Sequence, residues 1–82
     1  MKTNIFLTAI KNRNELKFLY SLTELIIEPY YVAREKSGRK VIYGRVKRTN
    51  EVRKFEYNKI SNIRVLKEAK FSPVIPIISQ VS

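Results

Sequence analysis

The chain has 82 residues and a formal net charge of +10, because 17 lysines and arginines outnumber seven acids, all of them glutamates. It contains no cysteine and no histidine, which excludes disulfides and thiolate metal sites and removes the commonest general base. No two glutamates have the spacing of a metal cage or an acid/base pair, so we expect neither an enzyme nor a bound cofactor.

The first predicted element is a short helix over residues 4–13, which Thr3 or Asn4 can cap. Phe6 and Ala9 belong to its apolar stripe. Polar residues interrupt this segment, so it does not resemble a signal peptide, and no run approaches the roughly 18 apolar residues of a membrane span. We expect one cytoplasmic domain that is not bound to a membrane.

Five strands are predicted next, from alternating and branched residues. Pro29 predicts a bulge, bend or edge position, and Gly44 predicts a bulge or a close backbone approach. Gly38 provides the positive φ angle of the clearest turn. The predicted strands cover residues 15–20, 25–34, 39–47, 52–57 and 63–66. Short antiparallel strands in this order favour a small, nearly closed barrel over residues 15–67, because closure removes exposed edges.

Residues 68–82 form an extended apolar tail that two prolines prevent from being a helix. Such a tail either lies over the barrel or adds to an edge of a neighbouring subunit. A homodimer formed through the tail is therefore a hypothesis.

The positive charge is concentrated in the middle of the chain, where Arg53, Phe55 and Tyr57 alternate on one face of a predicted strand. A cation beside aromatic rings suits a ligand with negative charge and a flat face, such as a nucleotide or a single strand. The alternative is that both rings fill the core and that Arg53 packs only its stem there.

The order of these motifs resembles the WYL domain family. The resemblance rests on Thr8-Ala9-Ile10, on Leu16-Lys17-Phe18-Leu19-Tyr20, on Glu28-Pro29-Tyr30 and on the run from Arg53 to Ile60, and it covers residues 5 to 67. Lys59 stands where the family has a second arginine, and Lys40-Val41-Ile42 stands where it has Trp-Tyr-Leu. The histidine that often follows the first strand in the family is absent.

The resemblance implies a mainly β fold, with a short helix before a five-stranded antiparallel Sm-like barrel. Similar domains occur in transcription factors, often beside a helix-turn-helix segment, and in phage-defence and CRISPR-associated proteins, where they bind nucleotide-like ligands. This chain has no room for a helix-turn-helix segment, so the resemblance implies a free-standing bacterial ligand-binding module.

Five residues are predicted to bind the ligand, with Arg53 as the main anion contact. Lys59 and Lys17 supply further charge, while Phe55 and Tyr20 serve as stacking or wall residues. Tyr20 and Lys17 lie on opposite faces of their strand, so both can serve only if the ligand wraps an edge.

A diffuse electrostatic track is predicted around this site, with solvated surface charge as the alternative for each member: Lys40, Arg45, Lys47 and Arg48. Core packing is predicted for Tyr30 and Tyr31.

Two functions follow from these residues. The first is a non-enzymatic regulatory module that binds single-stranded DNA, RNA or a nucleotide-like ligand. The alternative is a dimeric protein-interaction module that modulates a separately encoded regulator or enzyme.

Overall fold

The computed structural model describes residues 2–72, beginning with helix α1, Lys2–Asn12. The helix buries Phe6 and Ala9, which share a face because they are three residues apart. It ends where Arg13 takes a left-handed conformation with φ of 59°. The predicted helix is confirmed, with both ends slightly earlier in the chain. Within residues 2–72, no helix is both long enough and apolar enough to cross a membrane.

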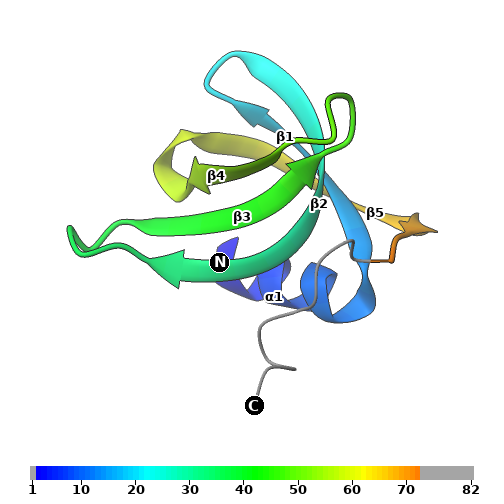
Figure 1. Ribbon diagram of the computed structural model, residues 1–82, viewed down its shortest axis with the longest axis horizontal. Coiled ribbons are helices and arrows are strands. Elements are labelled where there is room, and N and C mark those ends of the chain that lie inside the picture. Colours follow the sequence, from blue (N-terminus) through cyan, green and yellow to red (C-terminus); the bar gives the residue numbers. More distant parts are fainter. Residues whose placement is uncertain (1, 73–82) are drawn as a thin grey trace.

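Five antiparallel strands follow in one sheet, whose order is β4-β3-β2-β1-β5. The sheet curls over α1, and the short 3-10 helix η1, Tyr57–Lys59, joins its two outer strands (Figure 1). This confirms the predicted fold class, one short helix followed by five antiparallel strands in a barrel-like sheet. The strands are β1 Asn14–Tyr20, β2 Thr23–Arg34, β3 Lys40–Val46, β4 Val52–Glu56 and β5 Ile60–Lys70.

The last strand is longer than the predicted residues 63–66. It pairs with β1 from Tyr20↔Ile60 to Asn14↔Lys70, and two register shifts let it follow β1 over that length. Residues 68–70, which the sequence predicts as part of the tail, therefore belong to β5. Residues 73–82, and with them the hypothesis of a dimer formed through the tail, lie outside the described residues.

The long strand β2 bends where Pro29 and Gly44 face each other. A register shift follows Pro29, which confirms the predicted bulge. A Cβ atom on Gly44 would lie 2.7 Å from the carbonyl oxygen of Glu28, so only glycine permits β2 and β3 to approach this closely. Gly38, with φ of 93°, forms the predicted turn between the same two strands.

The core lies inside the curled sheet and against the helix. Fully burying each of its large apolar side chains stabilises the fold by about 1.5–3 kcal/mol. Aromatic residues from α1, β1 and β4 meet here, so the helix closes one end of the barrel and the strands enclose the rest (Figure 1). The buried cluster consists of Phe6, Ala9, Leu16, Phe18, Leu25, Ile27, Ile42, Val46, Phe55 and Ile60.

Candidate nucleic-acid interface

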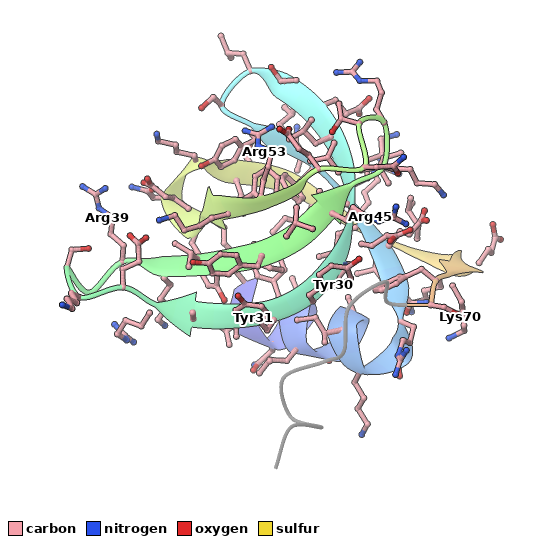
Figure 2. The ribbon with its side chains drawn as sticks, viewed as in Figure 1. Tyr30, Tyr31, Arg39, Arg45, Arg53 and Lys70 are labelled. Carbon is pink, nitrogen blue, oxygen red and sulfur yellow. The ribbon has the colours of Figure 1, made fainter. Side chains whose placement is uncertain are left out.

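Arg53 lies on β4 with its guanidinium carbon 5.1 Å from the centre of the Phe55 ring (Figure 2). Arg53 and Phe55 share a face of the strand because they are two residues apart. Arg53 is exposed, and it forms no ion pair with any residue between 2 and 72. An arginine that is held on an aromatic face and lacks a carboxylate partner can bind a phosphate by donating hydrogen bonds to it.

Phe55 is fully buried, at 0% exposure. Its ring packs edge-to-face against Phe18, at 5.5 Å between centroids, and against Tyr20, at 5.0 Å. The prediction that Phe55 stacks on a ligand therefore needs correction, because both faces of its ring are covered by protein. Phe55 is a core residue whose ring packs against the guanidinium of Arg53.

Tyr20 is half-buried at the end of β1, and its hydroxyl oxygen accepts a hydrogen bond of 3.1 Å from the backbone N–H of Glu56. This bond links β1 to β4, although the two strands are not neighbours in the sheet. The Tyr20 ring packs on the same Phe55 ring that lies under Arg53.

Lys59 is exposed at the end of η1, and the next residue, Ile60, pairs with Tyr20. The carbonyl oxygen of Lys59 also accepts a 2.9 Å hydrogen bond from the backbone N–H of Ser21. Arg53 and Tyr20 thus contact Phe55 directly, whereas Lys59 is linked to Tyr20 only through their chain neighbours Ile60 and Ser21. We call Arg53, Phe55, Tyr20 and Lys59 the Arg53 site.

Lys17 lies apart from the Arg53 site, on the opposite face of β1 from Tyr20 as predicted. Its ammonium is 3.6 Å from a carboxylate oxygen of Glu24, and its cross-strand partner is Arg64. Lys17 and Arg64 line a polar hollow of about 720 Å³ together with Asn62. Arg64 was not among the predicted residues, because its place beside Lys17 depends on the register between β1 and β5.

Two of the four predicted track residues are engaged in ion pairs with buried glutamates. Arg45 donates from Nε and Nη2 to Glu28 at 3.0 and 2.9 Å, and Lys47 donates to Glu15 at 2.6 Å. The hydrogen bond that Arg45 donates to Glu28 raises the pKa of Arg45, and the one that Lys47 donates to Glu15 raises the pKa of Lys47. Their main role is to compensate carboxylates that the fold has removed from water.

Lys40 and Arg48, the other two track residues, are exposed and form no ion pair with the described residues. They remain available to attract a polyanion. In all, five of the seven glutamates hold a basic partner within the described structure, which leaves most lysines and arginines without a neutralising carboxylate.

The two neighbouring tyrosines of β2 behave differently. Tyr30 is buried at 1% exposure, as predicted for a packed residue. Tyr31 is only half-buried and stacks on Tyr43 of β3, with 4.6 Å between ring centroids and 18° between planes. The bulge after Pro29 separates the two environments. Among the described residues, no group of three or more acidic side chains is placed to hold a metal ion.

Comparison with solved structures shows a fold similar to part of Proteasome accessory factor B/C (PafBC) of Arthrobacter aurescens. The TM-score is 0.80 at 17% sequence identity, over 96% of this chain. The chain spans 14% of the length of that PafBC chain. No protein-family model and no curated protein matches the sequence. At this identity the likeness shows the fold alone, and it supports the WYL-like fold that the motifs predict.

Proposed function

We propose that this chain is a non-enzymatic regulatory module of the WYL type that binds single-stranded nucleic acid or a nucleotide-like ligand at the Arg53 site. The observation that carries the proposal is the guanidinium of Arg53, which rests 5.1 Å above the Phe55 ring and has no carboxylate partner among residues 2–72. Arg53 would contact a phosphate, Lys59 would add a second charge, and the ring of Tyr20 would flank a base or sugar.

The composition of the site favours a single strand over a duplex. Sequence-independent binding of single strands combines a basic groove with aromatic side chains beside the bases. Tyr20 and Arg53 both contact one buried ring, Phe55, so the site is compact and matches one or two nucleotides better than a duplex groove. Lys40 and Arg48 would raise the local concentration of the polyanion without fixing its position.

The experiment is fluorescence anisotropy with labelled single-stranded DNA, single-stranded RNA and duplex DNA, at about 50 and about 200 mM salt. We expect the single strands to bind more tightly than the duplex and to weaken steeply at the higher salt. Arg53→Ala should weaken binding about tenfold or more, since a hydrogen bond to a charged group contributes about 1.5–3 kcal/mol.

The matched control is Arg48→Ala, which removes the same charge from an exposed hairpin outside the Arg53 site. Its effect should be about threefold or less, as for one charge in a diffuse field. Equal losses in the two variants would leave a basic surface but no site at Arg53. Absence of binding by the wild-type chain at low salt would reject the proposal.

A further inference from the structure

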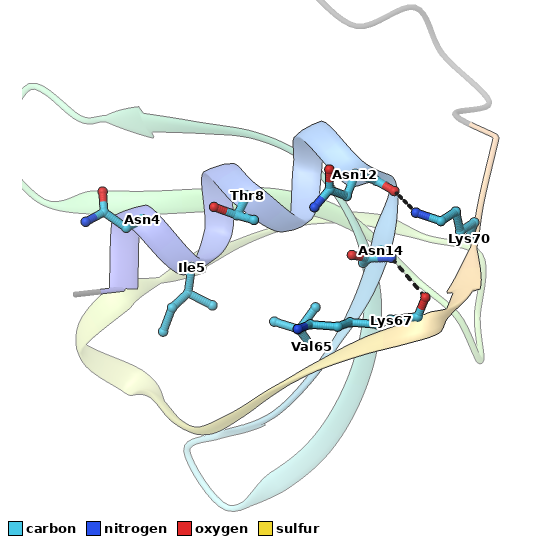
Figure 3. A pocket seen from close by; sticks show the side chains of 8 residues that line it. All are labelled: Asn4, Ile5, Thr8, Asn12, Asn14, Val65, Lys67 and Lys70. Carbon is cyan, nitrogen blue, oxygen red and sulfur yellow. Dashed lines mark hydrogen bonds between the residues drawn. The ribbon is translucent and has the colours of Figure 1, made fainter.

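A groove of about 520 Å³ runs between α1 and the last part of β5, and we call it the α1–β5 groove (Figure 3). It shares no lining residue with the Arg53 site. Lys70, at one end of the groove, also lies well away from Arg53 (Figure 2). The groove is therefore a second concave surface with its own chemistry.

One wall is a column of polar side chains on α1: Asn4, Thr8 and Asn12. They are four residues apart, so successive members are separated by about 6 Å along the helix axis. An extended peptide presents equivalent backbone groups every second residue, at about 6.4–6.8 Å. The three side chains are exposed and form no hydrogen bond with residues 2–72, so all three can bond to such a backbone.

Asn14 adds a buried polar group to the opposite wall. Its side chain belongs to a residue only 3% exposed, and its Nδ2 donates to the carbonyl oxygen of Lys67 at 3.4 Å. This bond lies where the register between β1 and β5 shifts. The Asn14 side chain thus gives the Lys67 carbonyl oxygen a hydrogen-bond donor at this irregular point of the strand pairing. Its amide oxygen is turned toward the space between helix and strand (Figure 3), and it accepts no hydrogen bond from the described residues.

The remaining lining residues give the groove an apolar surface and a positive charge. Ile5 and Val65 provide apolar surface, and the Lys67 side chain extends along the groove beneath the helix (Figure 3). Lys70 closes one end by donating to the backbone oxygen of Asn12 at 2.9 Å. None of the described lining residues is acidic or aromatic. A groove without aromatic rings lacks the stacking surface that single-stranded nucleic acid uses.

We propose that the α1–β5 groove binds an extended, acidic peptide segment of a partner protein. The column from Asn4 to Asn12 covers about 12 Å, which is the length of about four extended residues. The peptide backbone would bond to the column and to the Asn14 amide. An apolar side chain would rest on Ile5 and Val65, and a carboxylate would meet the Lys67 ammonium. This is peptide recognition through main-chain bonds, with side chains setting specificity.

The test begins with selection of a phage-displayed random peptide library on the full chain. The peptides recovered are then synthesised and measured by fluorescence polarisation. We expect recovered sequences to share one aspartate or glutamate beside an apolar residue. Exchange of that acid for its amide should weaken binding about tenfold, as expected for loss of a charge-assisted bond.

Two variants locate the binding. Thr8→Glu places a carboxylate within the groove, where it can pair with Lys67 and repel the peptide, and should weaken binding at least tenfold. Leu7→Glu adds the same charge at an exposed position of α1 outside the groove, and should change binding less than twofold. Circular dichroism checks that both variants fold, and Lys67→Gln, which should also weaken binding about tenfold, replaces Thr8→Glu if that variant does not.

The proposal is overturned if no peptide is recovered, or if the recovered peptides bind the Leu7→Glu and Thr8→Glu proteins equally well. Competition with single-stranded DNA separates this groove from the Arg53 site. Oligonucleotide at saturating concentration should leave peptide binding unchanged, and displacement of the peptide by the oligonucleotide would show that both ligands use one surface.

Discussion

The hydroxyl of Tyr20 and the backbone N–H of Glu56 form a 3.1 Å hydrogen bond that joins the end of β1 to the end of β4. In the sheet order these strands are separated by β2 and β3. The bond therefore helps the curled sheet to close on itself, in the same region where the Tyr20 ring packs against Phe55. The Tyr20 side chain therefore contributes both to the stability of the fold and to the geometry of the Arg53 site.

Replacing Tyr20 with phenylalanine keeps the ring and removes only the acceptor. We expect the free energy of unfolding to fall by about 1–2 kcal/mol, because the Glu56 N–H loses its partner, and the melting temperature to fall by roughly 5–10 °C. Thermal melts followed by circular dichroism measure this. Tyr43→Phe is the control: the Tyr43 hydroxyl forms no hydrogen bond with the described residues, so its loss should cost less than about 0.5 kcal/mol. Equal losses in the two variants would contradict the role given to the Tyr20 bond.

Gly44→Ala should destabilise the fold by about 1–3 kcal/mol. The new methyl group would lie 2.7 Å from the Glu28 carbonyl oxygen and 2.8 Å from Cδ1 of Ile27, so the two strands must separate. Gly38→Asn tests the other glycine, where a side chain meets open space and asparagine tolerates the positive φ. That variant should cost less than about 1 kcal/mol in urea unfolding, and a larger cost than that of Gly44→Ala would show that backbone conformation, not contact, is the constraint.

The Lys47–Glu15 pair predicts a loss of stability at high pH. The hydrogen bond that Lys47 donates to Glu15 raises the pKa of Lys47 in the folded chain above its ordinary value of 10.5. The unfolded chain therefore releases this proton first as pH rises. The contribution of the pair is complete below the ordinary pKa and disappears as pH rises through the higher value of the folded chain.

Urea unfolding between pH about 8 and about 11.5 measures this loss. Lys47→Met should show a smaller decline over the same interval, because the paired ammonium is absent. Lys11→Met, at an exposed helix position without an ion pair in the described structure, should decline as the wild-type chain does. If the free energy of unfolding of Lys47→Met falls with pH as steeply as that of the wild-type chain, the pH dependence belongs to other groups.

Phe55→Leu separates the core role of Phe55 from ligand binding. Loss of the buried ring should lower the free energy of unfolding by about 1–2 kcal/mol. Affinity for single-stranded DNA should fall only about two- to fivefold, because Arg53 keeps its charge and loses a cation–π contact of about 0.5–1 kcal/mol. Anisotropy well below the melting temperature measures the second effect. A loss larger than that of Arg53→Ala would mean that the ring itself contacts the ligand.

The fold was predictable because its signals are local. The bulge after Pro29, the turn at Gly38 and the close approach at Gly44 each depend on the conformational limits of one residue. Gly38 separates two strands, and the other two residues shape the strands that contain them. The sequence does not predict the end of β5, because three of its last four residues are charged and its length is set by pairing with β1.

The site was predicted less completely because side-chain partners lie far apart in the chain. Arg45 and Glu28 are 17 residues apart in the chain, and Lys47 and Glu15 are 32 apart. The sequence alone therefore does not distinguish these two ion-paired residues from Lys40 and Arg48. Alternation correctly placed Phe55 on the face of Arg53, but it does not show whether that face points to a ligand or to the core. The sequence interpretation gave Asn4, Thr8 and Asn12 no role in binding, because polar positions on a helix usually face only water.

The position of Arg53 on the Phe55 ring also affects the thermodynamics of binding. A free arginine side chain carries about 2 kcal/mol of rotamer entropy, part of which is lost when a ligand immobilises it. Here the guanidinium is already restrained by a ring that is itself fixed between Phe18 and Tyr20. Much of the ordering of this side chain therefore occurs when the chain folds. If a phosphate binds as proposed, it meets a preorganised cation, and a variant that loosens the fold should also weaken binding.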